Sequence, residues 1–588
     1  MALPTTSSPR NPSAPGPPDP APGPPDPAPG RTSARRRRAA YPSGPGLVLG
    51  LAALLPLAFL AVFFVLPVGG MLARGFLPDG RLDLSGVPEV LGRARTLRVL
   101  WFTLWSSAAG TAGTLLLGLP TAYVLHRLRF PGRGLLRAVV IMPFVLPTVV
   151  VGVMFRSLLS TGGPLGFLGL DGTWVPILLA FVFFNLAVVV RTVGGMWEGL
   201  DRRAEESAAT LGATPWQVWR TVTLPALAPA VVSAATLVFL FCSTAFGVVL
   251  TLGGLRYGTV ETEIYLLTTQ FLDLQGAAVL SVLQLVAVVV MLTLAARTRR
   301  RTEGALKRVG ARAAARRPRR EDAAALAVTA LAVALVLVPV GTLVVRSLRR
   351  GGAWTLENYR MLTDPTSTPV LRVSVTDAVE NSLRTAVDAT VIAMTLGLIV
   401  ALVVSRRPRS PGWARAVSLL DGAFMLPLGI SAVTVGFGFL ITLDRPPLDL
   451  RSSPVLVPIA QAMVALPLVV RTLTPVLRSV DPRQREAAAA LGAGPWRAAW
   501  TAEAPVLARP LAAATGFAFA VSLGEFGATA FLARPDRPTV PVVIYQLISR
   551  PGAENLGMAL AASVVLAGLT VAVMAVVERL RVGSVGTF

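Results

Sequence analysis

Twelve apolar stretches, each at least about 20 residues long, constrain this chain more than any other feature of its sequence. A helix of that length crosses the hydrocarbon core of a bilayer, where the backbone must satisfy its own hydrogen bonds. Only 15% of the 588 residues are charged, whereas soluble domains carry roughly 25%. The sequence therefore predicts an all-α polytopic membrane protein. We place its spans near 47–72, 99–125, 138–159, 174–195, 226–252, 277–296, 323–345, 383–404, 416–441, 454–475, 510–532 and 558–577.

The chain also repeats itself at an offset of 280 positions. The segment EESAATLGATPWQVWRTVTLP (205–225) returns as REAAAALGAGPWRAAWTAEAP (485–505), and 10 of the 20 positions counted from Glu206 and Glu486 are identical. The tetrapeptide VVRT recurs at 189–192 and 469–472. Each half has six predicted spans, an even number, so both halves insert the same way up. We therefore expect two homologous six-helix halves related by a parallel pseudo-two-fold repeat.

These patterns divide the chain into four regions. Residues 1–45 contain APGPPDP twice and read as a disordered Pro/Arg-rich tail, because such a sequence cannot bury a core. The first permease-like half is 46–297, a basic linker follows at 298–322, and the second half is 323–588. Most of the 55 Lys and Arg residues lie on one side in this topology. The positive-inside rule then places both termini, the linker and both repeated segments in the cytoplasm.

Composition excludes several classes of function. The net charge of +24 does not indicate nucleic-acid binding, because the basic residues lie in short loops between spans. The single cysteine, Cys242, excludes internal disulfides, and the single histidine, His126, cannot form a metal site alone. No nucleophile–base set is evident, so we predict no catalytic residue, no metal, no cofactor and no enzymatic activity. The only lysine, Lys307, does not lie in a phosphate-binding loop.

The repeated segment is predicted to form a short helix, a turn and a second helix. Acidic residues at its start favour a helix N-terminus, Gly212 suits the end of that helix, and Pro215 suits the first turn of the next. Pro225 is expected to end the segment just before the following span. Small residues such as Ala208 leave the first helix thin, so the segment suits insertion into a cleft of another protein.

EESAATLGA with Pro225, and REAAAALGA with Pro505, resemble the EAA loop of ABC-importer permeases, which seats in the ATPase subunit. Ser207 departs from the motif, which favours Ala there. The resemblance implies an ABC-importer permease in the bacterial cell membrane, two copies of a separate ATPase that hydrolyses the ATP, and an extracytoplasmic solute-binding protein. The coupling residues that it implies are Glu206, Ala208, Gly212, Pro225, Glu486, Ala488, Gly492 and Pro505.

The resemblance leaves the substrate open between thiamine or a related cation, ferric iron and another small solute. Fused two-half permeases of this type carry thiamine or ferric iron, and FGVVLTLGGLRYGTVETEIY (246–265) is most similar to the thiamine type. SLGEFGATAFLARPDRPTVPVVIYQLI (522–548) fits both types. We expect a substrate pathway near Phe246, Gly247, Glu525, Phe526 and Gly527.

The role of Glu525 is open between two alternatives. A carboxylate inside a span usually faces the protein interior, where it could bind a cationic substrate or serve a structural role at a helix break. The recurring Tyr265 and Tyr545 are expected at outer positions, where they could meet a solute-binding protein.

Two other functions compete with an ABC permease. An autonomous secondary transporter could also have twelve spans in two repeats, although it needs no docking loop. A membrane scaffold or sensor is the third alternative.

Overall fold

The computed structural model describes residues 51–581 except 78–79, 82, 255, 307–314, 365–369, 407–410, 430 and 445–448. The predicted tail at 1–45 and part of the predicted linker lie outside the described residues.

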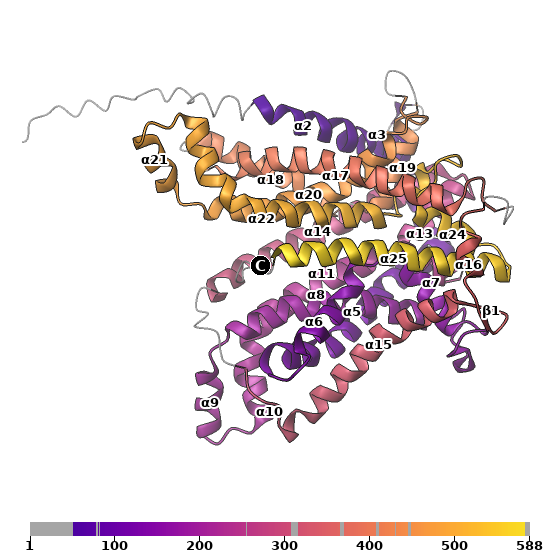
Figure 1. The fold of residues 1–588 in the computed structure, drawn as a ribbon. Coiled ribbons are helices and arrows are strands. Elements are labelled where there is room, and N and C mark those ends of the chain that lie inside the picture. The colour runs from indigo at the N-terminus through magenta and orange to yellow at the C-terminus, as the bar shows by residue number, and fades with distance from the viewer. Residues whose placement is uncertain are drawn as a thin grey trace, which may run out of the picture. The chain divides into compact units, whose positions relative to one another are not determined.

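Helices make up nearly all of the described structure (Figure 1). The first half contains α2 (Leu54–Leu60), η1 (Ala61–Val65), α3 (Leu66–Phe76), α4 (Gly86–Gly92), α5 (Ala94–Arg127), α6 (Arg133–Ile141), η3 (Met142–Val145), α7 (Thr148–Leu159), η4 (Gly166–Leu168), α8 (Val175–Gly199), α9 (Arg202–Thr210), α10 (Pro215–Val218), η5 (Trp219–Thr223), α11 (Leu224–Ser243), α12 (Gly247–Leu252), α13 (Val260–Thr269) and α14 (Leu274–Leu306). The second half contains η6 (Arg320–Asp322), α15 (Ala323–Ser347), β1 (Arg349–Arg350), β2 (Ala353–Trp354), α16 (Glu357–Arg360), α17 (Val375–Ser405), α18 (Pro411–Gly429), α19 (Ala432–Thr442), α20 (Leu456–Ser479), α21 (Pro482–Ala490), α22 (Pro495–Gly524), α23 (Thr529–Leu532), α24 (Val540–Ile548) and α25 (Ala553–Arg581).

The described helices confirm the predicted class of polytopic all-α protein. Ten of them are long and apolar enough to cross a membrane, and two bent pairs raise that number to twelve if each pair counts as one span. The only described sheet is the hairpin β1–β2, in which Arg349 pairs with Trp354 and Arg350 with Ala353. The two bent pairs lie where we predicted the third span of each half.

Those third spans are not the continuous helices that we expected. In the first half, the 138–159 stretch bends by 106° between η3 and α7. Pro147 accounts for this bend, because proline lacks an N–H donor and the residue before it, Leu146, is extended (φ −69°, ψ 137°). In the second half, Pro427 stands near the end of α18, and the Ser431 side chain caps the start of α19. The sequence shows these prolines, but the spans were predicted from hydropathy, which does not distinguish a continuous helix from one that is broken at a proline.

The fifth spans also break earlier than predicted. Instead of one helix over 226–252, α11 ends at Ser243 and α12 begins at Gly247. Instead of one helix over 510–532, α22 ends at Gly524 and α23 begins at Thr529. A Cβ atom on Gly527 would lie 2.9 Å from the Cβ of Ala432, so glycine permits the close approach of this break to α19. The short buried helices α13 and α24, which we did not predict, follow these breaks.

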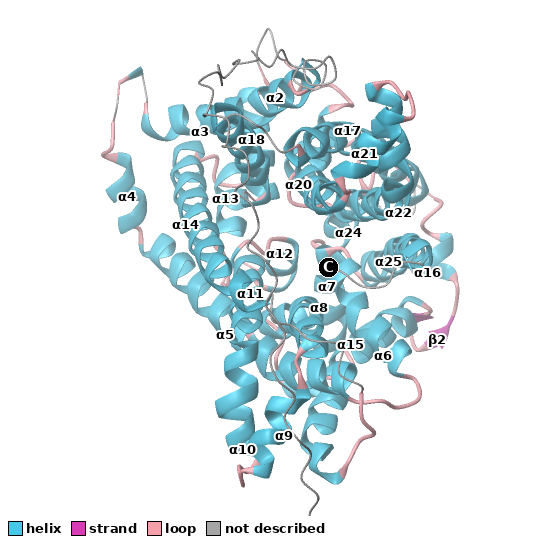
Figure 2. Ribbon diagram, turned by 90° about the vertical axis from the view of Figure 1, so that its left-hand side faces the viewer, coloured by secondary structure: helices cyan, strands magenta, loops and turns pink. Residues whose placement is uncertain are grey.

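The first span of each half contacts both halves. The helix α15 opens the second half and packs against α5, α6 and α7 of the first half and against α25 of its own (Figure 2). The helix α3 packs against α14 of its own half and against α19 of the second. The largest apolar core contains buried residues of both halves, such as Val149 and Val543. The interface between the halves is therefore continuous with the interior of each half.

Candidate functional site

The first repeated segment forms the predicted helix–turn–helix, which we call the first hairpin (residues 201–225). Asp201 caps α9, because its side chain accepts a hydrogen bond from the backbone N–H of Arg203 (3.0 Å). At the other end the backbone N–H of Ala213 donates to the Ala208 carbonyl oxygen (3.1 Å). Gly212 completes this turn with φ of +87°, a left-handed conformation that glycine adopts without steric strain.

The second hairpin (residues 481–505) repeats this geometry. Asp481 caps α21 through the backbone N–H of Arg483 (2.9 Å), and the N–H of Ala493 donates to the Ala488 carbonyl oxygen (3.0 Å). Gly492 has φ of +84°. Both hairpins lie at the same end of the long helices, opposite β1 and α16 (Figure 1). The sequence identity thus corresponds to one local structure that is built twice.

Each hairpin exposes an apolar side chain at its turn. Leu211 is 88% exposed and Leu491 is 90% exposed. Glu206 and Glu486 are exposed on the neighbouring helices, and the Glu206 carboxylate lies 3.8 Å from Arg202. Large aliphatic side chains that are almost fully exposed to solvent at matched positions are typical of a protein–protein contact site.

One detail of the predicted hairpins is wrong. Pro225 does not end the first segment before the next span, because α10, the π-helical turn η5 and α11 run on as one candidate span from Pro215 to Ser243. A π turn widens the helix and accommodates a proline that cannot donate a backbone hydrogen bond. Pro505 likewise lies inside the continuous helix α22. Each hairpin is therefore rigidly continuous with a membrane-spanning helix.

The first hairpin is tied to α5. The guanidinium of Arg127, at the end of α5, forms an ion pair with the Glu205 carboxylate. Thr223 Oγ1 donates to the other oxygen of that carboxylate (2.9 Å). Trp219 of the hairpin stacks on Trp197 of α8, with ring centroids 5.5 Å apart. The hairpin is thus fixed both to α5 and to α8.

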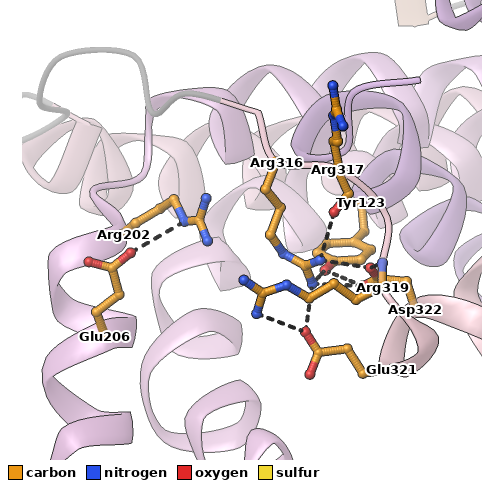
Figure 3. A network of polar contacts seen from close by, with 8 residues as sticks. All are labelled: Tyr123, Arg202, Glu206, Arg316, Arg317, Arg319, Glu321 and Asp322. Atoms are coloured by element: carbon orange, nitrogen blue, oxygen red, sulfur yellow. Dashed lines mark hydrogen bonds and ion pairs between the residues drawn. The ribbon is translucent and has the colours of Figure 1, made fainter. Parts of the chain in front are cut away.

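The end of the linker lies on the same part of α5 (Figure 3). Arg316 donates two hydrogen bonds to the Asp322 carboxylate (2.8 Å each) and one to the Tyr123 hydroxyl (2.9 Å). Its backbone pairs with Arg127 and Arg129, which carry the chain out of α5. The start of the second half is therefore anchored beside the arginine that holds the first hairpin.

Five aromatic rings from both halves meet at the breaks in the fifth spans. Phe246 and Phe526 stack with their centroids 5.3 Å apart and their planes at 25°. Tyr265 lies against Phe246 and Phe531 (5.4 and 5.3 Å), and Tyr545 lies against Phe526 (5.5 Å). We call these five residues the aromatic cluster. Tyr265 and Tyr545 face each other at 6.5 Å, and both are half-buried.

Glu525 is buried beside this cluster and acts as a cap. Its carboxylate accepts hydrogen bonds from the backbone N–H groups of Ala528 (2.8 Å) and Thr529 (3.1 Å). These groups belong to the break that leads into α23. The contacts favour the structural alternative for Glu525.

A second buried carboxylate, Glu261 on α13, was not singled out from the sequence. It is fully buried and lies where α13 meets α14 and the start of α19. The internal repeat could have singled out Glu261 in the sequence, because the matched position 280 residues later holds Pro541 and not an acid. Among the described residues, no group of three or more His, Cys, Asp or Glu side chains could hold a metal ion.

Comparison with known families finds two matches within the chain. The model of the binding-protein-dependent transport system inner membrane component matches residues 114–300 and 393–581. Each matched region contains one hairpin and one of the two tyrosines of the aromatic cluster. The repeat seen in the sequence therefore corresponds to two copies of one family unit.

Several named proteins are similar to this chain. The thiamine transport system permease protein ThiP of Brucella abortus (strain 2308) is 28% identical over 93% of this chain and 97% of its own length. ThiP of Escherichia coli (strain K12) is 29% identical over 76% of this chain and 83% of its own. The sulfate transport system permease protein CysT of Escherichia coli (strain K12) is 32% identical but covers 44% of this chain and 96% of its own length.

Proposed function

Since the chain belongs to the family of binding-protein-dependent transport system inner membrane components, we propose that its hairpins receive two copies of an ATPase and that its substrate is thiamine or a related aromatic cation. The chain is the permease subunit of an inner-membrane ABC importer, a system that works with an ATPase and a binding protein. The family is one of transport components, as expected for a chain that is not itself an enzyme. This membership sets aside the autonomous secondary transporter and the scaffold.

The two apolar turns support the proposal of two ATPase copies. Leu211 and Leu491 are exposed at matched positions, on hairpins with the same capped and glycine-terminated helix. Exposed leucine in water is unfavourable by about 25 cal/mol per Å² of apolar surface, and burial in a partner's cleft removes that penalty. The Lys/Arg bias supports a cytoplasmic position for both hairpins, where ATP is available to the partner.

The residues proposed for ATPase coupling are spread over the two hairpins. Glu206, Ala208, Gly212 and Pro225 form the first set, and Glu486, Ala488, Gly492 and Pro505 form the second. Because each hairpin continues directly into α11 or α22, a movement of the bound ATPase would move the breaks at Phe246 and Phe526. The hairpins and the aromatic cluster are thus the two ends of the same pair of helices.

The aromatic cluster and the names of the long relatives support thiamine. Thiamine has a positively charged thiazolium ring and an aminopyrimidine ring, and both can stack on aromatic side chains. A cation over an aromatic face gains about 0.5–2 kcal/mol. We propose that Phe246, Gly247, Phe526 and Gly527 line the pathway, and that Glu525 positions the break between them. Two relatives that are named for thiamine transport cover 93% and 76% of this chain.

Uptake by reconstituted vesicles tests the substrate. The chain would be purified with the ATPase and the binding protein from neighbouring genes and placed in proteoliposomes loaded with ATP. We expect ATP-dependent accumulation of radiolabelled thiamine only in the presence of the binding protein. Accumulation of ferric iron or sulfate in place of thiamine would refute the proposed substrate while leaving the permease function intact.

A further inference from the structure

Glu261 joins the two halves at a buried point. Ser431 Oγ, at the start of α19 in the second half, donates a hydrogen bond to one oxygen of the Glu261 carboxylate. Gln284 Nε2, on α14 of the first half, donates to the other oxygen. The carboxylate therefore lies between three helices and has only neutral hydrogen-bond donors.

No positive charge accompanies this carboxylate among the described residues. Glu263, two residues away, pairs with Arg95 (Nε–Oε1 2.5 Å), and Glu525 caps a helix through backbone N–H groups. Gln284 is itself nine-tenths buried, and its Oε1 atom has no hydrogen-bond partner in the described part of the chain. A buried charge without a counter-charge is strongly unfavourable, and so is a buried acceptor without a donor. In this conformation, therefore, the site holds a carboxylate and a carbonyl oxygen that both lack their best partners.

The internal repeat shows that the fold does not need these polar groups. The helix α24 packs against α7 in the second interface, as α13 packs against α19 in the first. Thr259 and Thr539 occupy the N-cap positions of α13 and α24, so Glu261 corresponds to Pro541. Pro147 precedes α7 where Ser431 precedes α19. The stretch of α25 that corresponds to Gln284 is apolar, Val564–Leu566. The same interface is thus built once with a polar set and once without it.

The polar set lies next to the aromatic cluster. Tyr265 follows Glu261 by four residues on α13, and residues at that spacing share one helix face. Tyr265 is in ring contact with Phe246 and Phe531, so the cluster begins one helical turn from the carboxylate. A negative group, an unpaired acceptor and aromatic faces are therefore adjacent at a contact between the halves.

We propose that Glu261 and Gln284 bind the transported organic cation, the carboxylate taking its positive charge and Gln284 Oε1 accepting an N–H donor from it. Separation of α19 from α13 would release Ser431 from the carboxylate and open the site to the pathway. The inference rests on the proposed import of a thiamine-like cation, and it assigns the recognition of charge to one side of the pseudo-two-fold axis. The apolar set around Pro541 contributes no charge.

The test compares a cationic and a neutral ligand in the complete transporter. Uptake of radiolabelled thiamine by the proteoliposomes would be inhibited with unlabelled thiamine and with thiochrome, its neutral oxidised analogue. We expect Glu261→Gln to lower thiamine uptake at least about tenfold and to reduce the preference for thiamine over thiochrome. The control is Asp388→Asn, which removes an exposed acid from α17. It should leave both the rate of thiamine uptake and the preference for thiamine over thiochrome unchanged.

The possible outcomes separate this inference from the proposed function. Normal thiamine uptake by Glu261→Gln would overturn the inference and leave thiamine import intact. An equal loss of affinity for thiamine and thiochrome would show that Glu261 only holds the halves together, and would also overturn it. If Glu261→Gln does not assemble with the ATPase, Gln284→Leu keeps the acid and must still lower the preference for thiamine.

The experiment also distinguishes the two proposals if the wild-type complex transports a substrate other than thiamine. If it carries another organic cation, the proposed substrate fails, but the inference stands when Glu261→Gln loses that uptake. If it carries ferric iron or an anion, both fail.

Discussion

Arg127 at the end of α5 forms its ion pair with Glu205 of the first hairpin, whereas Arg406, at the corresponding end of α17, pairs with Glu503 on α22. Glu503 occupies the repeat position of Thr223, and Arg485 stands where the first hairpin has Glu205. The acid that pairs with the arginine at the helix end thus lies on α9, the first helix of the hairpin, in one half and on α22, which follows the turn, in the other. The two hairpins are alike in shape and differ in how they are attached.

This difference predicts unequal local stability after matched mutations. Glu205→Gln leaves the buried Arg127 guanidinium without its counter-charge, a loss of about 3 kcal/mol or more for such a pair, so α9 should open more often. Hydrogen exchange of residues 202–212 should accelerate. Glu503→Gln breaks the pair on α22 and should leave the exchange of α21 unchanged. Equal acceleration of the two hairpins would contradict the asymmetry.

The left-handed glycines predict a backbone effect on ATPase binding. Gly212→Val and Gly492→Val each place a branched side chain at φ near +85°, where L-residues lose about 1–2 kcal/mol. Co-purification of the ATPase should fall in each single variant and be lost in the double variant, with unchanged abundance in the membrane. Gly212→Asn is the control, because asparagine tolerates this conformation better. A double variant with normal ATPase binding would refute the coupling role of the hairpins.

The exposed leucines predict a contribution of side-chain contact. Leu211→Ser and Leu491→Ser should each weaken the ATPase complex about tenfold or more, as expected for apolar anchors of an interface. Phe167→Ser is the matched control, because Phe167 is 81% exposed on η4, away from both hairpins. The dissociation constant would be measured on the purified permease in detergent. A similar effect of all three substitutions would indicate a general loss of stability.

The proposed orientation predicts which loops react from outside the cell. Cys242 is buried, so its replacement by Ala provides a cysteine-free background. A cysteine at Phe167, in a predicted outer loop, should react with an impermeant maleimide in intact cells. A cysteine at Thr210, in the first hairpin, should react only after the membrane is opened. The reverse pattern would invert the proposed topology.

The stacked rings predict energetic coupling between the halves. Phe246→Ala and Phe526→Ala should each destabilise the protein by about 3–5 kcal/mol, because both side chains are buried. The double variant should lose about 0.5–1.5 kcal/mol less than the sum, the interaction of an aromatic pair. Unfolding in detergent would be followed for the wild type, the single variants and the double variant. Strict additivity would show that the contact between the rings does not couple the halves.

The sequence by itself determined the spans, the repeat and the hairpins, because each of these depends on residues close together in the chain. The length of apolar runs predicts the spans, and the spacing from Asp201 to Gly212 predicts a capped helix that ends in a left-handed turn. Pro147 carried the signal for the bent third span as well, although a hydropathy profile does not show it. The matched segments at 205–225 and 485–505 then predicted a second hairpin of the same shape.

Only the tertiary structure decided which of these elements meet and which buried groups are left without partners. Ser431 and Glu261 are 170 residues apart, and no local periodicity relates them. Phe246 stacks on Phe526 because two separate halves pack across the pseudo-two-fold axis. The same packing made Glu525 a satisfied helix cap and left Glu261 without a counter-charge among the described residues, since burial and partners belong to the assembled interface and not to either segment alone.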